Sequence, residues 1–408
     1  MAARYVTRFR CLAGDCEATC CAGLGITLEA SEHRRLKVLA AGDPAREAIL
    51  ERAVQLTPNG PHYAQLRTTD GGGCPALDET GLCRIHAQFG HDALFDVCAT
   101  YPRYANDVDG ELEVFGALSC PEMVRLALLS EDGFELEPLQ LEAPRKLRNR
   151  FETKHPYFRP FRRVQSAVLK LLSEPGYTLS QKLFVLLWAG DKLRPVLHAR
   201  SSNVPEAGVV AVFDALGESA VLGALASSYA SLPLDGRLAL RVLHSALRPA
   251  TAPQPSANTG RFESLVAQTW QALALPVDAD PNDSELASAW ARLDGLRSAQ
   301  PPEVSERLTA CLTRYVANHA LTTPYMLYES FFDYAYDLVV RVASLRLLLF
   351  THSAVVQATP AELDGIIVAT TFTFARAVDH TDLPRRLQAA LAQQGLDSLA
   401  HCVAFLAV

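Results

Sequence analysis

The sequence predicts a mainly α-helical protein: a small, irregular, cysteine-rich α+β domain followed by a larger all-α helical bundle. Three observations predict it. Eight of the ten cysteines lie in the first 120 of 408 residues. From about Arg145 onward, apolar residues recur with a period near 3.6, with Pro and Gly between the periodic stretches. The chain is 49% apolar and 20% charged, as globular proteins are. We expect a cysteine domain at 1–130, a basic connector at 131–160 and a helical domain at 161–408.

Composition excludes several classes of protein. No apolar run approaches the ~18 residues that a membrane-spanning helix needs. The N-terminus has arginines but no apolar segment of the kind that directs export, so we expect a cytoplasmic protein. In a reducing cytoplasm, dense cysteines are more typical of metal binding or catalysis than of disulfides. The net charge of -7 argues against non-specific binding to nucleic acid or to an anionic membrane.

The first cysteine cluster has the pattern C-x4-C-x3-C-C, formed by Cys11, Cys16, Cys20 and Cys21. Thiols this close in sequence can converge on one centre at little cost in loop-closure entropy. A short strand at 25–28 and a helix at 32–40, capped by Ser31, are expected to follow.

Two further cysteines flank a predicted turn. Cys74 and Cys83 stand on either side of Asp78-Glu-Thr-Gly81, in which glycine can take a positive φ. We expect two short extended arms that bring the two sulfur atoms together.

The last two cysteines adjoin predicted helices. Cys98 follows a short helix at 92–97, and a hairpin with an Asp-Gly turn is predicted over 104–115. Cys120 precedes a proline and a helix at 123–129, so we expect a helix N-terminus to stabilise its thiolate.

The cysteine spacing favours iron over zinc. No C-x2-C pair occurs anywhere in the chain, so a zinc ribbon is a poor match. Iron–sulfur clusters commonly take four thiolates, so eight cysteines could hold one cluster with further structural contacts, or two centres. Individual cysteines could instead be buried small side chains. Cys311 and Cys402 stand alone in apolar helical settings and are expected only to pack.

The linked motifs resemble the flagellin lysine N-methylase (FliB-type) family over about residues 5–130. The motifs are Phe9-x-Cys11, Cys16-x3-Cys20-Cys21, Cys74-x8-Cys83-Arg84-Ile85, Cys98-x-Thr100-Tyr101-Pro102-Arg103 and Leu118-Ser119-Cys120-Pro121-Glu122. Weaker similarities follow at Leu187–Gly190 and Tyr315–His319. The resemblance implies methyl transfer from S-adenosylmethionine to lysine ε-amines of flagellin. It also implies a [4Fe-4S] cluster on cysteines of this region, for which the candidates are Cys11, Cys16, Cys20, Cys21, Cys74, Cys83, Cys98 and Cys120.

Methylation by polar displacement requires a deprotonated lysine, whose ordinary pKa is ~10.4. Tyr101 and Tyr104 are the nearest candidates to assist, and Arg103 could pair with a substrate carboxylate. Alternatively, 101–103 is a structural corner. Radical enzymes that bind S-adenosylmethionine carry the motif C-x3-C-x2-C, whereas Cys21 directly follows Cys20 here. This departure leaves open whether methyl transfer is radical or polar. Two other functions stay open: a non-catalytic zinc- or iron-binding protein, and a methylase of a non-flagellin substrate.

The remainder of the chain is expected to be helical. One apolar stripe begins at Phe161, and Thr178 with Gln181 forms a possible capping box. The segment 145–170 holds nine Lys or Arg and one acid, with aromatics between them. It could dock an acidic protein face or be an ordinary solvated helix face. A linker is expected at 251–260. Further helices are expected at about 183–188, 207–216, 219–231, 234–247, 261–274, 284–296, 303–321, 326–350, 360–378 and 382–406.

Overall fold

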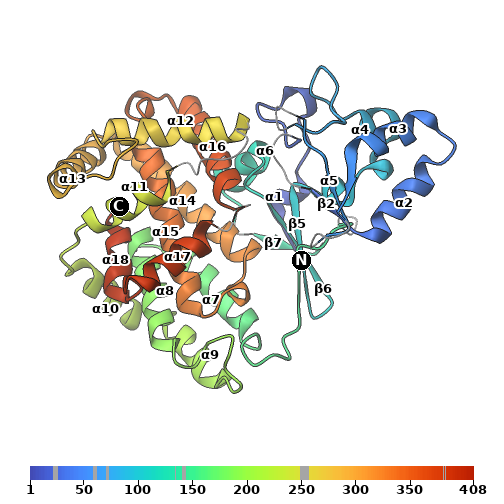
Figure 1. Ribbon diagram of the computed structural model, residues 1–408. Helices are drawn as coiled ribbons and strands as arrows, with labels where there is room; N and C mark the ends of the chain where they lie inside the picture. The colour runs from blue at the N-terminus through green and yellow to red at the C-terminus, as the bar shows by residue number, and fades with distance from the viewer. Residues whose placement is uncertain are drawn as a thin grey trace.

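The computed structural model describes residues 1–21, 26–57, 62–69, 73–133, 135–139, 144–248, 257–379, 381 and 383–408. It confirms the predicted fold class: a mixed α/β region with sheets is followed by a larger helical region (Figure 1). The linker predicted at 251–260 falls largely outside the described residues, and its last residues begin helix α12 (Ala257–Ala272).

A five-stranded sheet lies between the cysteine-rich region and the helices. Its order is β7-β1-β6-β5-β8, with strands β1 (Ala2–Ala3), β5 (Arg103–Val108), β6 (Glu111–Gly116), β7 (Leu136–Glu137) and β8 (Asn149–Phe151). The predicted hairpin is confirmed as β5 and β6. Its turn residues Asp109 and Gly110 have φ of 54° and 85°, the conformation that an Asp-Gly pair supplies most easily.

A second, three-stranded sheet of order β2-β4-β3 carries the outer part of the N-terminal region. Its strands are β2 (Thr27–Leu28), β3 (Val54–Leu56) and β4 (Ala64–Leu66), and helices α2 (Ala30–Ala40) and α3 (Pro44–Ala53) accompany them. The expected cap was wrong: Glu29 stands at the N-cap of α2, without a side-chain hydrogen bond. Helix α3 was not predicted, although Asp43 caps it by accepting from the N–H groups of Ala45 and Arg46.

The helical region is built around α15 (Phe331–Phe350), in which 18 of 20 residues are buried. The helices that surround it are α7 (Phe161–Ser173), α8 (Leu179–Leu193), α9 (Glu206–Ala215), α10 (Ser219–Ala230), α11 (Arg237–Ala246), α12, α13 (Asp283–Ser298), α14 (Pro302–Thr322), α16 (Pro360–Val378), α17 (Leu383–Gln393) and α18 (Leu399–Ala407). The predicted stripe on α7 is confirmed, since every residue of it is buried. The Thr178–Gln181 capping box is also confirmed, at the start of α8.

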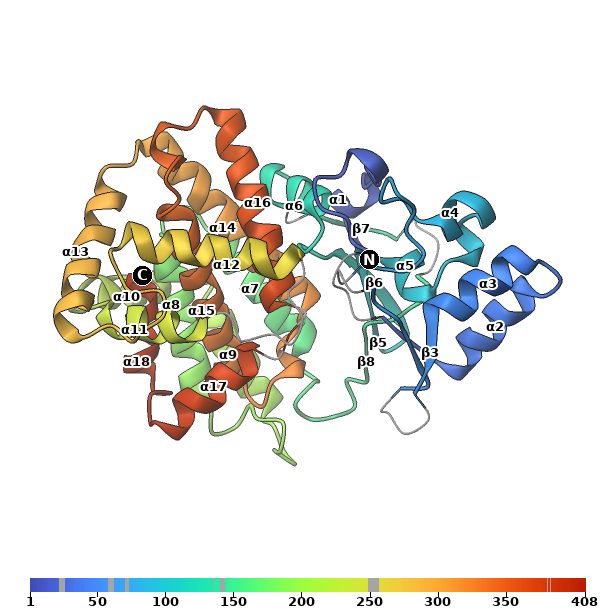
Figure 2. The same ribbon diagram turned by 45° about the horizontal axis from the view of Figure 1, so that its top comes forward.

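The two regions share one hydrophobic core. This core runs from Ala2 to Val408, whereas a separate small core, spanning residues 26–95, lies under the three-stranded sheet. Asn318 of α14 donates hydrogen bonds to the Tyr5 hydroxyl and, at 3.2 Å, to the Gly116 carbonyl, and so ties the helices to the large sheet. Helix α16 packs against α6 (Pro121–Val124), which follows the last cysteine of the N-terminal region (Figure 2).

Among the described helices, none is by itself long and apolar enough to cross a membrane. Among these helices, only α9 and α10 taken together are long and apolar enough, and they are bent by 74° relative to each other.

Candidate functional site

All eight cysteines of the N-terminal region line one cavity of about 520 Å³. Seven of these side chains are half-buried and Cys11 is exposed. Cysteines as far apart in sequence as Cys11 and Cys120 therefore contribute thiols to a single space. The lining also includes Arg10, Arg67, Arg103 and Arg376.

The predicted turn between Cys74 and Cys83 is present. Gly81 has φ of 80°, and the Asp78 carboxylate accepts from the N–H groups of Thr80 and Leu82. A β-bridge between Leu77 and Cys83 brings the arms together. The Cys74 N–H also donates to the Cys21 carbonyl at 2.9 Å, which holds the first cysteine cluster against this turn.

The sequence misplaced the helix beside Cys98. Residues 91–93 form a single 3-10 turn, and α5 (Asp96–Thr100) contains Cys98 rather than preceding it. Arg35 supports this arrangement: its guanidinium pairs with Asp96 at 2.6 Å and donates to main-chain carbonyls just before α5. Cys98 consequently points into the cavity from a short, braced helix.

Cys120 is the N-cap of α6, as predicted, but its thiolate is not stabilised. Burial raises the pKa of Cys120 to about 12, although the N–H groups of Met123 and Glu122 partly oppose the shift. The expectation was wrong because desolvation outweighs the helix N-terminus at this position.

Cys20 and Cys21 behave as a pair. Their sulfur atoms are 4.0 Å apart. The hydrogen bond from Cys21, together with the nearby Arg376 guanidinium, lowers the pKa of Cys20 to about 7 despite burial. The same contact and burial raise the pKa of Cys21, so the pair ionises at Cys20 first.

The thiols fall into two neighbouring groups. An inner group consists of Cys20, Cys21, Cys74, Cys83 and Cys98. Burial raises the pKa of Cys98 far above its ordinary value, and negative charge on Cys74, Cys20 and Cys83 raises it further. Three of these cysteines also pack against the small core.

The outer group consists of Cys11, Cys16 and Cys120. The pKa of Cys16 is raised by burial and also by its negatively charged neighbours, including Cys11 and Cys20. The pKa of Cys120 responds to Cys16 and Cys20 in the same way. Cys20, a member of the inner group, is thus a thiol that also lies next to the outer group.

Within the described part of the chain, no three His, Cys, Asp or Glu side chains are close enough together to hold one metal ion. A single tetrahedral zinc would draw four sulfurs to ~2.3 Å from a common centre. Cys20 and Cys21, whose sulfur atoms are 4.0 Å apart, have no third such side chain close enough to complete this arrangement among the described residues.

Tyr101 and Arg103, the predicted catalytic candidates, both line the cavity. The Tyr101 hydroxyl lies 3.1 Å from the Ser119 hydroxyl, and burial raises the pKa of Tyr101 well above its usual range. The phenol therefore stays protonated near neutral pH. The Arg103 guanidinium lies 5.5 Å from the centre of the Phe9 ring, and its buried Nε has no hydrogen-bond partner among the described residues.

Arg376 was not predicted and comes from helix α16, far along the chain. Its guanidinium donates to the carbonyls of Ser119 at 2.8 Å and Ala18 at 3.0 Å. It therefore joins the segments that carry Cys16, Cys20 and Cys120. No local pattern around residue 376 could have predicted this contact, because its partners are more than 250 residues earlier.

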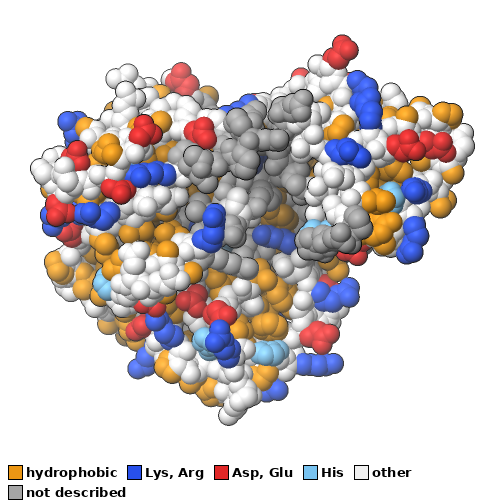
Figure 3. Space-filling model, viewed as in Figure 1, with side chains coloured by type: hydrophobic (Ala, Val, Ile, Leu, Met, Phe, Trp, Pro, Cys, Tyr) orange, Lys and Arg blue, Asp and Glu red, His pale blue; other side chains and the backbone are white. Residues whose placement is uncertain are grey.

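The basic segment at 145–170 is largely neutralised by local acids. Five of its cations form ion pairs: Arg145 with Asp92, Lys146 with Glu29, Arg150 with Asp107, Arg162 with Glu111 and Glu113, and Arg163 with Asp214. On the face shown in Figure 3, positive and negative side chains intermix rather than gather by sign. The ion pairs favour an ordinary solvated surface over a docking strip, although only 161–170 of this segment is helical, in α7.

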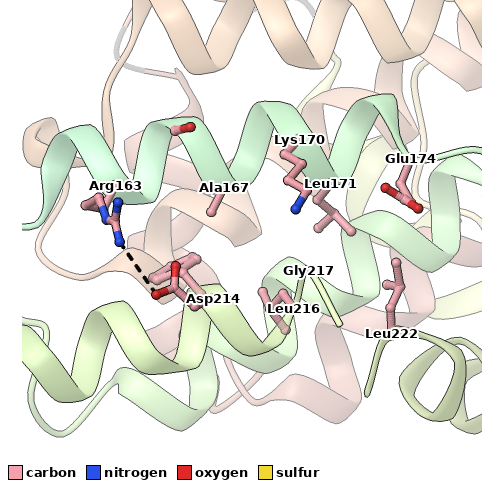
Figure 4. Close-up of a pocket in the computed structure, with 11 residues that line it drawn as sticks. Arg163, Ala167, Lys170, Leu171, Glu174, Asp214, Leu216, Gly217 and Leu222 are labelled. Carbon is pink, nitrogen blue, oxygen red and sulfur yellow. Dashed lines mark ion pairs between the residues drawn. The ribbon is translucent and has the colours of Figure 1, made fainter. Parts of the chain in front are cut away.

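A smaller pocket of about 160 Å³ lies between α7 and the α9–α10 connection (Figure 4). Arg163 of α7 reaches Asp214 of α9 across it at 3.7 Å, with both side chains mostly exposed. Such an exposed pair contributes ~0–1 kcal/mol. We assign no function to this pocket.

Comparison with known proteins places the chain in a family. A family model for the FliB lysine N-methylase C-terminal domain matches residues 165–405, which is more than half of the chain. The lysine-N-methylase of Salmonella typhimurium is 32% identical over 134 residues, which cover 32% of this chain and 33% of that protein. The lysine-N-methylase of Salmonella choleraesuis is equally similar.

The flagellar biosynthetic protein FliU of Salmonella muenchen is 31% identical over 134 residues, covering 32% of this chain and 78% of that protein. The similarity thus spans about a third of the two lysine-N-methylases. No solved structure matches the chain. The match over the helical region agrees with the resemblance predicted from the cysteine-rich region: the chain belongs to the FliB lysine N-methylase family.

Proposed function

We propose that this protein transfers methyl groups from S-adenosylmethionine to lysine side chains of flagellin, at the cysteine-lined cavity. The observation that carries the proposal is the convergence of all eight N-terminal cysteines on one cavity. Family membership and the names of the relatives, lysine-N-methylase and flagellar biosynthetic protein, support the reaction and the substrate.

An iron–sulfur cluster would take its ligands from the eight thiols that line this cavity. Repulsion between neighbouring thiolates raises the pKa of Cys98 and Cys74, and a cationic metal centre would relieve that repulsion. We propose that the ligands of a [4Fe-4S] cluster come from the inner group, Cys20, Cys21, Cys74, Cys83 and Cys98.

The outer group then faces the remaining space of the cavity. When bound, a cluster with an open iron would supply a site for the amino and carboxylate groups of S-adenosylmethionine. Arg103 of the cavity lining would pair with a carboxylate there, because its buried Nε lacks a partner in the described structure. Tyr101 stays protonated, so it would donate a hydrogen bond to a ligand rather than remove a proton.

The lysine acceptor needs a dry site, because loss of water favours the neutral amine over the ammonium. The cavity is lined mainly by thiols and apolar side chains, including Phe9, Leu94 and Phe95, all buried. These residues would exclude water from the reacting amine. Two alternatives are separated from this proposal by experiment. One is methylation of a substrate other than flagellin, and the other is metal binding without catalysis.

The test uses anaerobically purified full-length protein, S-adenosylmethionine and unmodified flagellin. Intact-mass spectrometry is expected to show flagellin gaining mass in steps of one methyl group. Iron and sulfide analysis of the same sample distinguishes a cluster from zinc. An iron-loaded protein that methylates neither flagellin nor other lysine-containing proteins would support a non-catalytic metal protein instead.

A further inference from the structure

The charges that line the cysteine cavity are unbalanced. Four arginines line it, whereas Glu122 is the one acidic side chain among the described lining residues. The Glu122 carboxylate accepts a hydrogen bond at 3.1 Å from Arg125, which lies outside the lining. Its charge is therefore already compensated, and the lining arginines receive no counter-charge from it.

Two of the four lining arginines already have a place in the site. Arg376 donates to main-chain carbonyls beside the cysteines, and its charge contributes to the lowered pKa of Cys20. Arg103, with its buried Nε, would pair with the carboxylate of the methyl donor under the proposed function. Arg10 and Arg67 are the two lining arginines that remain.

Arg10 and Arg67 are exposed, and their charges are not paired with acids. Arg10 Nη1 donates to the Phe9 carbonyl at 2.8 Å, and Arg67 Nε donates to the Val54 carbonyl at 3.4 Å. Neither guanidinium forms an ion pair with an acidic side chain in the described structure, unlike the five paired cations of the 145–170 surface. Neutral carbonyls thus hold these two groups in place while their positive charge stays available to a ligand.

A like charge lies close to Arg10. Burial, and then the charge of Arg10, lower the pKa of Arg103. Both side chains contact Phe9, Arg10 through the Phe9 carbonyl and Arg103 over the Phe9 ring. An anion beside Arg10 would relieve the repulsion between the two guanidinium groups.

The cavity lies between the two hydrophobic cores of the chain. Phe9, which precedes Arg10, belongs to the large core, and Leu66, which precedes Arg67, belongs to the small core. Phe9 and Leu66 also line the cavity. Exposed lining residues mark where a cavity opens to solvent, so each side contributes one exposed arginine to the opening.

We propose that Arg10 and Arg67 dock acidic side chains of the protein substrate at the opening of the cysteine cavity, so that lysines with Asp or Glu nearby in sequence are preferred targets. A lysine alone carries a positive charge and is repelled by this opening. Acidic neighbours offset that repulsion and stay at the exposed opening, while the amine enters the dry part of the cavity. The preference among lysines rests on the proposed function, whereas the docking of acidic side chains does not.

The first experiment measures binding without methylation. Two fluorescein-labelled peptides differ only in whether Glu or Gln flanks a central lysine, and fluorescence anisotropy with the anaerobically purified full chain gives their Kd values. Wild type should bind the Glu peptide more tightly than the Gln peptide. Arg10→Gln and Arg67→Gln should each raise the Kd of the Glu peptide by ~2- to 5-fold, the range of one exposed ion pair, and added salt should reduce the difference.

Arg34→Gln is the matched control. Arg34 is exposed, has no ion pair in the described structure and does not line the cavity, so its replacement should leave both Kd values unchanged. Arg10→Lys and Arg67→Lys keep the positive charge and should retain most of the preference. Equal binding of the two peptides by wild type, or an equal loss in Arg34→Gln, overturns the docking.

Two further measurements separate docking from a role in the metal or donor site. The iron and sulfide content and the Kd of S-adenosylmethionine should be the same in wild type, Arg10→Gln and Arg67→Gln. Loss of iron overturns the docking. Weaker binding of S-adenosylmethionine without weaker binding of the Glu peptide overturns it as well.

The second experiment tests the preference among lysines. With the two peptides as methylation substrates, wild type should show a lower KM for the Glu peptide at a similar kcat, and Arg67→Gln should remove much of that difference. Equal KM values, together with tighter binding of the Glu peptide, would overturn the preference. Absence of methylation of both peptides and of flagellin by wild type would instead defeat the proposed function and leave the binding result standing.

Discussion

Arg376 Nε donates a hydrogen bond to the carbonyl oxygen of Ser119, 2.8 Å away and 257 residues earlier in the chain. The donor belongs to α16, inside the region that matches the family, and the acceptor directly precedes Cys120. A second bond from the same guanidinium reaches Ala18, between Cys16 and Cys20. The helical region therefore helps to shape the cysteine cavity.

Replacement of Arg376 by alanine should weaken both the fold and the cavity. Two charged hydrogen bonds to carbonyls are lost, so we expect the free energy of unfolding to fall by ~1.5–3 kcal/mol in urea denaturation, with less iron bound per chain. Arg314→Ala is the matched control, because Arg314 donates to the Leu128 carbonyl at 2.8 Å but does not line the cavity. Equal iron loss in both variants would contradict a local role for Arg376.

Cysteine substitutions should differ sharply in their effect on iron and sulfide binding. Cys98→Ser is expected to abolish most iron and sulfide binding, since Cys98 lies in the cavity among three other thiols. Cys311→Ser, in a buried position on α14 whose thiol faces the Leu128 carbonyl, should retain both. Metal and sulfide analysis of anaerobically purified variants measures this. Full iron content in Cys98→Ser would remove it from the ligand set.

The metal-free protein should show a distinctive pH dependence of thiol alkylation. Cys20, with a pKa of about 7, is a thiolate above that pH, whereas Cys120, at about 12, stays protonated. Peptide mass mapping after brief iodoacetamide treatment should find the Cys20 reaction rising with a midpoint near pH 7. Alkylation of Cys120 at a lower pH than Cys20 would contradict the pKa values given for these two thiols.

The same shifts set the effect of pH on stability. The folded pKa of Cys20 lies below its ordinary value of 9.0, so its contribution to stability grows as pH rises from about 7 toward 9. The folded pKa of Cys120 lies above 9.0, so its contribution is present below pH 9 and is lost as pH rises toward about 12. Thermal unfolding of Cys20→Ser and Cys120→Ser across this range should separate the two effects.

A glycine in the helical region should be intolerant of substitution. A Cβ on Gly190 of α8 would lie 2.7 Å from Phe332 Cα of α15, so Gly190→Ala is expected to cost ~1–3 kcal/mol. Gly295 of α13 is exposed and has nothing within 4 Å of an added Cβ, so Gly295→Ala should stabilise by ~0.5–1 kcal/mol. Urea denaturation measures both, and equal effects would contradict the close α8–α15 packing.

Local signals predicted much of this fold. The Asp-Gly turn, the Thr178 capping box and the stripe on α7 each depend on residues within a few positions of one another, and each is confirmed. The turn between Cys74 and Cys83 was also predicted from residues close together in sequence, and it is present in the structure. Gly190 permits the close approach of α15 to α8.

Long-range contacts could not be predicted in this way. Arg376 approaches the cavity only because α16 packs on α6, and neither helix carries a local sign of the other. Arg341 of α15 likewise forms an ion pair with Asp379, which directly follows α16. Even the pKa of Cys120 was misjudged, because burial by distant segments outweighs the nearby helix N-terminus.

The most direct test of the account is intact-mass spectrometry of flagellin incubated with S-adenosylmethionine and the anaerobically prepared full chain. Wild type and the Cys311→Ser variant should add mass in steps of one methyl group, and the Cys98→Ser variant should add none. Unchanged flagellin with an iron-loaded wild-type protein would contradict the proposed function. Full activity in Cys98→Ser would contradict the placement of the reaction at the cysteine cavity.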